Sequence, residues 1–227
     1  EIVDDINDDY DILLISGGHR GPGKLINPGT VRRLQSLGFS SWLSYALHGL
    51  RRHPKQVIFR LDGARKVYAG QEDAMYHVQR ACLALSDFTI FQSQFSIETF
   101  ADVGLDPKRF TVVTNGVDPS IFFPQEPAHP LGHPIRIVSA SWSKNPRKGH
   151  DVIAAFSELP GVEVTFVGNW ADGVDSKHVR LLPPKEQREL ADHLREHDLF
   201  LFPSKDEACP NVVLEALACG LPVLYAD

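Results

Sequence analysis

The sequence lacks a long hydrophobic run and a surplus of positive charge, and it contains few cysteines. No apolar stretch approaches the roughly 18 to 20 residues needed to span a bilayer. No basic segment followed by an apolar core opens the chain, so we expect no signal peptide. The three cysteines, Cys82, Cys209 and Cys219, lack metal-ligand spacing and are typical of reduced residues in a cytosolic protein. The formal net charge of −6 argues against a nucleic-acid-binding protein.

What the chain does contain is an ordinary globular composition and an alternation of strand and helix patterns. Its 227 residues are 43% hydrophobic and 23% charged, which fits one large or two modest α/β domains. The alternation predicts parallel, doubly wound sheets. Strands are predicted at 10–16, 56–61, 86–93, 109–113, 135–140, 162–168, 179–182, 199–202 and 222–225. Helices are predicted at 30–52 (broken near 38), 73–85, 95–103, 152–159, 185–197 and 210–220.

A proline-rich segment divides the chain. Residues 124–134, PQEPAHPLGHP, contain four prolines in eleven positions and show no periodicity, which is typical of a linker. We therefore predict an N-terminal domain over residues 1–128 and a C-terminal domain over residues 129–227.

The most informative stretch is LFLFPSKDEACPNVVLEALACG, residues 199–220. It reads as a buried strand, a polar loop and a helix, with Glu207 before the helix and Glu215 in its second turn. A helix N-terminus at the carboxyl end of a parallel strand presents N–H groups and the positive end of the helix dipole, which together favour an anion. Two carboxylates around such a site can hold hydroxyl groups on both sides of a bound phosphate.

Two other segments allow more than one interpretation. Gly18 to Lys24 satisfies the G-x-x-x-x-G-K part of a P-loop, but Leu25 stands where a magnesium-binding Ser or Thr is needed and Pro28 interrupts the following helix. A surface loop is the favoured interpretation, and a P-loop nucleotidase is kept as an alternative. The basic group at 51–55 fits a solvated helix end as well as a binding patch.

A further ambiguity lies at the end of the second predicted strand. Arg60 and Asp62 stand at its carboxyl end, where open α/β sheets bind ligands. They fit a local ion pair in a strand-end turn equally well.

Three motifs in order resemble the retaining glycosyltransferases of family 4, which have the GT-B fold. These are NGVD with IFFP (115–118 and 121–124), NPRKG (145–149) and the E-x7-E motif in FPSKDEACPNVVLEALACGLPV (202–223). FRLDG and SDFTIFQS also resemble strands of the acceptor-side domain in bacterial members. The resemblance implies an α/β fold with two Rossmann-like domains and parallel sheets, the first for the acceptor and the second for a nucleotide-sugar donor.

The resemblance also implies a reaction. Members move a sugar from a nucleotide-diphospho-sugar to a glycan, glycolipid or other hydroxyl acceptor, often in polysaccharide biosynthesis. Retention is ascribed to attack on the same face with assistance from the leaving phosphate, so we expect no covalent nucleophile. GT-B enzymes generally work without a metal, and we expect no cofactor. The expected location is the cytoplasm, with peripheral contact at the inner membrane face as a second expectation.

The site residues follow from the same resemblance. Lys148, with Arg147 beside it, matches the residue that binds the diphosphate, and such electrostatic stabilisation is often a large catalytic term. Glu207 is assigned to hydroxyl groups of the donor sugar and Glu215 to those of the ribose. A solvated loop charge at Lys148 and a simple helix-dipole partner at Glu215 are the alternatives. The remaining donor-binding candidates are Lys144, Gly168, Asn169, Pro210, Asn211 and Val212.

The sequence also departs from the family pattern. Trp142 stands where many members carry an arginine, so either Lys144 substitutes for it or the second cation is missing. Asp62 occupies the place of a family histidine and is predicted to act in catalysis, with His19 as a weaker candidate. The family's first strand and its last elements are missing, so we expect a chain shortened at both ends. These departures leave a non-catalytic nucleotide-sugar-binding or scaffold protein as the alternative function, and neither the donor base nor the acceptor is encoded in a readable motif.

Overall fold

The computed structural model describes residues 11–16, 56–64, 66–67, 70–72, 74–107, 109–125 and 132–226. The chain divides into two compact units, Glu1–Thr114 and Asn115–Asp227. Several predictions lie outside the described residues: the P-loop at Gly18 to Lys24 (which includes His19), the helix at 30–52 and the basic group at 51–55.

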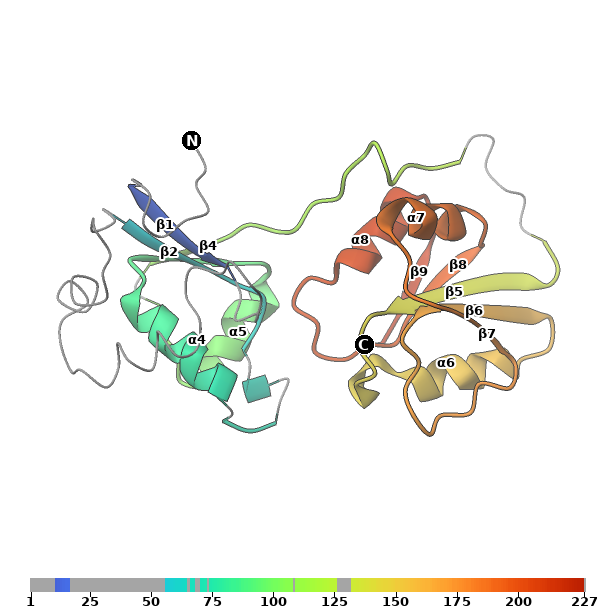
Figure 1. Ribbon diagram of the computed structural model, residues 1–227, viewed down its shortest axis with the longest axis horizontal. Helices are drawn as coiled ribbons and strands as arrows, with labels where there is room; N and C mark the ends of the chain where they lie inside the picture. Colours follow the sequence, from blue (N-terminus) through green and yellow to red (C-terminus); the bar gives the residue numbers. More distant parts are fainter. Residues whose placement is uncertain are drawn as a thin grey trace. The chain divides into compact units, whose positions relative to one another are not determined.

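The N-terminal unit contains a four-stranded parallel sheet in the order β1-β2-β3-β4. Its strands are β1 (Ile12–Ser16), β2 (Gln56–Leu61), β3 (Phe88–Phe91) and β4 (Phe110–Val112). Helices α4 (Ala74–Leu85) and α5 (Gln94–Asp102) pack against the sheet (Figure 1). Alternate strand residues such as Leu13, Phe59 and Phe91 point into the core, as the period of two along a strand requires.

The C-terminal unit contains a five-stranded parallel sheet in the order β7-β6-β5-β8-β9. Its strands are β5 (Ile135–Ser141), β6 (Val162–Gly168), β7 (Val179–Leu182), β8 (Leu199–Phe202) and β9 (Val223–Tyr225). Its helices are the short 3-10 helix η1 (Pro146–Lys148), α6 (His150–Ser157), α7 (Gln187–Arg195) and α8 (Asn211–Ala218). Helices α7 and α8 lie on one face and α6 on the other (Figure 1), each over its own apolar cluster. Strand order reverses between β5 and β8, where doubly wound sheets bind their ligands.

This architecture confirms the predicted fold class. Strands β2, β6, β7 and β8 have the predicted bounds. The clearest is β8, a compact apolar run that Pro203 ends. One difference lies before α6, where a loop was predicted and η1 forms instead. The Asn145 side chain accepts a hydrogen bond from the Arg147 N–H at 3.0 Å, and Gly149, at a φ of 70°, turns the chain into α6 two residues earlier than predicted.

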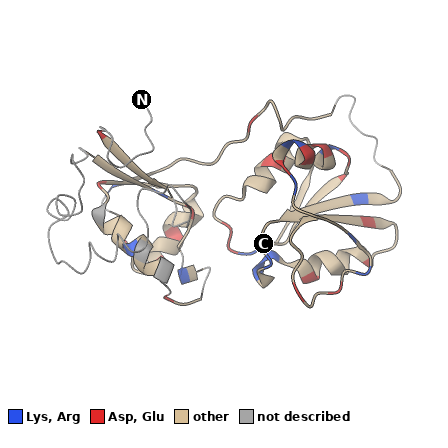
Figure 2. Ribbon diagram, in the orientation of Figure 1, with Lys and Arg blue, Asp and Glu red and all other residues tan. Residues whose placement is uncertain are grey.

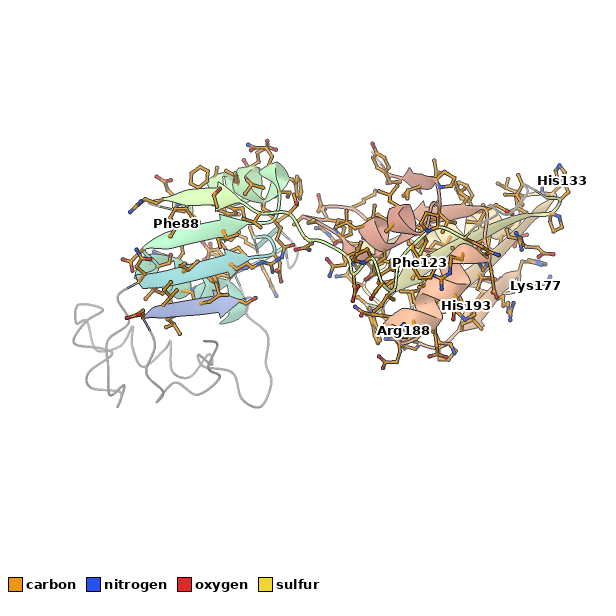
Figure 3. All side chains as sticks on the ribbon, turned by 90° about the horizontal axis from the view of Figure 1, so that it is seen from above. Phe88, Phe123, His133, Lys177, Arg188 and His193 are labelled. Atoms are coloured by element: carbon orange, nitrogen blue, oxygen red, sulfur yellow. The ribbon has the colours of Figure 1, made fainter. Side chains whose placement is uncertain are left out.

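The boundary between the two units falls after Thr114, earlier in the chain than the predicted boundary at 128/129. The segment 115–124 belongs to the C-terminal unit because its apolar side chains pack there: Phe122 is only 2% exposed and joins the cluster beneath α7 and α8. The Arg195 guanidinium donates to the Ile121 carbonyl oxygen at 3.1 Å and lies 4.5 Å from the centre of the Phe123 ring. Figure 3 shows Phe123 beside α7, the helix that carries His193.

In each sheet, an aspartate just before one strand forms hydrogen bonds with the start of the neighbouring strand. In the C-terminal unit, Asp198 accepts from the Arg136 N–H at 2.8 Å and from its guanidinium at 3.1 Å, and donates its own N–H to the Arg136 carbonyl oxygen at 2.8 Å. In the N-terminal unit, the Asp87 carboxylate accepts from the Val57 N–H, and the Asp87 N–H donates to the Val57 carbonyl oxygen, both at 2.8 Å. These bonds set the start of β8 against β5 and of β3 against β2.

The three cysteines are free thiols. Cys82 and Cys219 are buried, and burial raises the pKa of the Cys82 thiol to about 12. A thiol with so high a pKa is a poor nucleophile, which agrees with the predicted structural role.

Charges of both signs are interspersed along the described ribbon (Figure 2). Many are paired at the surface, as in Lys66–Glu72 at 2.8 Å and Lys185–Glu189 at 3.1 Å. Within the described part of the chain, none of the helices has both the length and the apolar character needed to cross a membrane.

Removing the Asp198 carboxylate is expected to destabilise the C-terminal unit. Its side chain is 2% exposed, so Asp198→Ala leaves the Arg136 guanidinium and N–H without their partner and costs about 3 kcal/mol of unfolding free energy. The control is Asp192→Ala, which removes an exposed pair with Arg195 and costs less than about 1 kcal/mol. Urea unfolding followed by circular dichroism measures both, and unchanged stability of Asp198→Ala would contradict this role.

Candidate functional site

A cleft of about 440 Å³ lies in the C-terminal unit at the carboxyl ends of its central strands. Its lining includes the ends of β5, β6 and β8, the last residue of η1 and the first two turns of α8. The cleft therefore occupies the switch point between β5 and β8, where the two halves of the sheet diverge and leave space between their loops.

The centre of the cleft is an ion pair between Lys148 and Glu207. The Lys148 ammonium donates to Oε1 of Glu207, and the Ser204 hydroxyl donates to the same oxygen at 2.6 Å. The two charged side chains are only 26% and 21% exposed, so solvent and salt screen this pair less than a surface pair. The pair joins the loop after β5 to the loop after β8 across the switch point.

A second link between the same two loops lies beside the cleft. The Lys205 N–H donates to the Arg147 carbonyl oxygen at 3.0 Å, and the Arg147 guanidinium pairs with the Asp206 carboxylate at 2.9 Å. Asp206 has a φ of 60°, a left-handed conformation that costs a residue with a side chain about 1 kcal/mol. The surrounding contacts thus hold the loop before α8 in one shape.

Two glycines allow the backbone to approach closely around the cleft. A Cβ atom on Gly149 would lie 2.8 Å from the ring and carbonyl oxygen of Pro203. A Cβ atom on Gly168, at the end of β6, would lie 2.0 Å from the Ser141 carbonyl oxygen, and Gly168 has a φ of 132°. Only glycine fits either position without displacement of the neighbouring strand or loop.

Helix α8 directs its N-terminus at the cleft. It begins at Asn211 after Pro210, and both residues line the cleft together with Val212. Proline has no side-chain group that accepts a hydrogen bond, so the N–H groups of Asn211 and Val212 stay available to a ligand, while the Val213 N–H donates to the Pro210 carbonyl oxygen at 3.1 Å. They add the positive end of the helix dipole to the charge of Lys148.

Glu215 lines the cleft from the second turn of α8. Burial raises the pKa of its carboxyl group above the ordinary value, because a partly buried carboxylate loses solvation when it is charged. Hydroxyl groups of a ligand would restore hydrogen bonds to the charged form.

The structure brings seven predicted site residues together around the cleft. They are Lys148, Gly168, Glu207, Pro210, Asn211, Val212 and Glu215.

Three other predicted residues lie beside the cleft rather than in its lining. Arg147 pairs with Asp206, as described above. Lys144 pairs with the Asp172 carboxylate at 2.7 Å at an exposed position. Asn169 supports the backbone, since its Nδ2 donates to the Trp142 carbonyl oxygen at 2.8 Å.

Asp62 lies in the N-terminal unit, just after β2. Its carboxylate accepts from Gln92 Nε2 at 2.5 Å and lies 3.9 Å from an Arg60 guanidinium nitrogen, while its carbonyl oxygen accepts from the Ser96 hydroxyl at 3.1 Å. The local ion pair that the sequence suggested for this strand-end turn is thus present. Asp62 also forms hydrogen bonds with Gln92 and Ser96, which follow β3 in the chain.

Sequence reasoning missed two residues that shape the site. Ser204 holds the Glu207 carboxylate, and its place directly after a buried strand and three residues before Glu207 was a usable signal. Asn115 was noted only as part of the NGVD motif, but its side chain bonds to the loop before α8. Among the described residues, no group of three or more His, Cys, Asp or Glu is arranged to hold a metal ion.

The fold and the cleft define a class of protein. The structure resembles sucrose-phosphate synthase from Thermosynechococcus elongatus, with a TM-score of 0.66 and 19% identity over 90% of this chain and 63% of that one. It also resembles Anabaena HepE in complex with UDP-glucose, with a TM-score of 0.61 and 19% identity over 82% of this chain and 56% of that one. The chain therefore has the GT-B glycosyltransferase fold.

The sequence shows a corresponding similarity. Residues 136–227 match the family model described as glycosyl transferases group 1, in line with the resemblance of the motifs to glycosyltransferases. The chain is 34% identical to the D-inositol 3-phosphate glycosyltransferase of Mycobacterium tuberculosis over 144 residues, which cover 54% of this chain and 30% of that protein. The same values hold for the Mycobacterium bovis protein of that name. The match thus spans less than a third of these curated relatives.

Substitution of Gly168 tests the close approach of β6 to β5. In Gly168→Ala the new methyl group collides with the Ser141 carbonyl oxygen, and we expect a loss of about 3 kcal/mol or more in stability. Gly173→Ala is the matched control, because Gly173 also has a positive φ (80°) but has open space around its Cβ position, so it costs only about 1 kcal/mol. Thermal unfolding measures the difference, and equal losses in the two variants would show that backbone conformation alone matters.

The raised pKa of Glu215 predicts a pH-dependent effect of its removal. A raised carboxyl pKa means that the folded state resists ionisation, so the contribution of Glu215 to stability falls as pH rises above the unfolded-state pKa, near 4.5. Glu215→Gln should therefore raise the melting temperature at pH 7.5, and the gain should vanish as pH falls toward 4.5.

Glu189→Gln provides a control of opposite sign. The Lys185 ammonium lowers the pKa of the Glu189 carboxyl, so its removal should not stabilise the protein at pH 7.5. Melting curves across this pH range test both variants, and a Glu215→Gln protein less stable than wild type at pH 7.5 would contradict the assignment.

Proposed function

We propose that this protein is a retaining glycosyltransferase that binds a nucleotide-diphospho-sugar in the cleft of its C-terminal unit and transfers the sugar to a hydroxyl group of a glycan or glycolipid. The observation that carries the proposal is the convergence of a lysine, a helix N-terminus and two glutamates on one cleft at the switch point. The likeness to the structure of Anabaena HepE in complex with UDP-glucose supports the donor class.

The cationic side of the cleft suits the diphosphate. Lys148 and the first-turn N–H groups of α8 supply positive charge from two directions. Because these groups are already in place, they stabilise the charge that develops on the leaving diphosphate without large rearrangement. No metal ion is part of the proposed chemistry.

The two glutamates suit hydroxyl groups on either side of that diphosphate. Glu207 shares Lys148 with the incoming phosphate, so phosphate binding frees part of its carboxylate to accept hydrogen bonds from the donor sugar. Glu215, whose burial disfavours its charged form, gains hydrogen bonds from the ribose hydroxyls. Both carboxylates therefore gain partners when the donor binds.

The reaction step needs no nucleophile from the protein. The acceptor oxygen forms a bond to the anomeric carbon on the face from which the diphosphate departs, and the bond between that carbon and the phosphate oxygen breaks. The acceptor proton passes to the leaving phosphate, whose negative charge Lys148 and α8 stabilise. The configuration of the anomeric carbon is retained.

A second candidate function is binding of a nucleotide sugar without transfer. Trp142, which is 71% exposed at the edge of the cleft, stands where many members carry an arginine. Lys144, the nearest substitute, is engaged by Asp172. Of the two lysines that line the cleft, Lys185 pairs with Glu189 and Lys148 with Glu207. Without the arginine of other members, this charge is enough for binding but weakens the case for fast departure of the diphosphate.

Ligand-induced thermal stabilisation tests donor binding. UDP, GDP, ADP and their sugar derivatives are screened, and the cognate donor at 100 times its Kd should add about 2.7 kcal/mol of stability to the unit that binds it. Lys148→Ala should weaken binding about tenfold or more, because it removes a charge-assisted hydrogen bond. Lys177→Ala, which removes an exposed charge (Figure 3), should bind as wild type does. A Lys148→Ala protein with unchanged affinity would contradict the site.

Turnover separates the two candidate functions. The transferase predicts donor hydrolysis or transfer by the full-length protein, with loss of activity in Glu207→Ala and retention of configuration in the product. Donor binding with no detectable turnover in the full-length protein would favour the non-catalytic alternative.

A further inference from the structure

Asn115 connects the start of the C-terminal unit to the turn that leads into α8. Its side-chain nitrogen Nδ2 donates to the Cys209 carbonyl oxygen at 3.1 Å and to Asn211 Oδ1 at 2.6 Å. These two acceptors flank Pro210, the N-cap of α8. The Asn115 amide therefore bridges the turn that precedes α8, the helix whose N-terminus lies at the cleft.

The bond to Asn211 fixes which way its side-chain amide is turned. An asparagine amide carries an acceptor oxygen on one branch and an NH₂ donor on the other. Since Oδ1 of Asn211 accepts from Asn115, its NH₂ group lies on the opposite branch. Asn211 lines the cleft, and a donor at this position favours an anion, whereas an acceptor would repel one.

The chain that follows Asn115 is anchored within the C-terminal unit. Further along the chain, the Asp118 carboxylate accepts from the N–H of Ser120 at 2.8 Å, and Phe122 is buried. An anchor fixed in this way loses little additional conformational entropy when a ligand binds.

We propose that Asn115 is a positioning residue for donor binding, which orients the Asn211 amide so that its NH₂ group faces the diphosphate of the nucleotide sugar. The inference rests on the proposed function, because it assumes an anionic ligand in the cleft. Asn115 itself touches the loop and not the ligand, so it acts through Asn211.

The test compares Asn115→Asp and Asn115→Ala in their affinity for UDP, or for whichever nucleoside diphosphate the wild type binds. An aspartate has no donor for Asn211 Oδ1 and instead accepts from its NH₂ group, which turns the oxygen toward the anion. We expect Asn115→Asp to weaken diphosphate binding about tenfold or more, and Asn115→Ala to weaken it less. Affinity for the matching uncharged nucleoside should change little, because the effect acts on the anion.

A double-variant cycle distinguishes positioning from a general structural role. If Asn115 acts through Asn211, Asn115→Ala should cost no further affinity once Asn211→Ala is present. Equal losses in the two backgrounds would overturn the proposal. So would a lower melting temperature of unliganded Asn115→Ala with an unchanged diphosphate Kd, because the contact would then serve the fold alone.

The outcomes also separate this inference from the proposed function. If the wild type binds nucleoside diphosphates and Lys148→Ala does not, the donor site stands, and unchanged binding by both Asn115 variants overturns only the positioning role. If the wild type binds none of the nucleotides, both the donor site and the positioning role fail.

Discussion

The ion pair between Lys148 and Glu207 is the interaction on which the site depends. It joins the loop after β5 to the loop after β8, and the Ser204 hydroxyl fixes its carboxylate end. Because strand order reverses between β5 and β8, their loops diverge, and an opposite-charge pair stabilises them at one separation. Under the proposed function, an incoming diphosphate would replace the attraction of Glu207 for the lysine with its own.

The rest of the C-terminal unit keeps these loops in place. Asp198 sets β8 against β5 at the far end of the strands. Gly168 lets β6 close against β5 at the near end. The segment from Asn115 to Phe122 is anchored on α7 and α8 and reaches the turn before α8 through the Asn115 amide. Each of these contacts connects residues that are far apart in the sequence. The shape of the cleft therefore depends on the whole C-terminal unit and not only on the NPRKG and E-x7-E motifs.

Much of this could be read from the sequence, and the exceptions have physical causes. Strands such as β6 and β8 were predicted at their observed bounds because short apolar runs with clear breaks have few other structures open to them. Glu207 and Glu215 stood out in the strand, loop and helix pattern and Lys148 through the family resemblance of its motif, and the structure gathers all three around one cleft. Composition located the proline-rich segment, but the packing of Phe122 in the C-terminal unit is a long-range contact that local sequence does not encode. The pairing of Lys144 with Asp172 joins positions 28 residues apart, and local sequence does not encode such a choice.

The most direct test of the account is a crystal structure of the protein with UDP-glucose or the donor that stabilises it most. The account predicts the diphosphate between the Lys148 ammonium and the first turn of α8, with the sugar beside Glu207 and the ribose beside Glu215. A nucleotide bound instead at the Gly18 to Lys24 segment, with the C-terminal cleft empty and the Lys148–Glu207 pair intact, would contradict it.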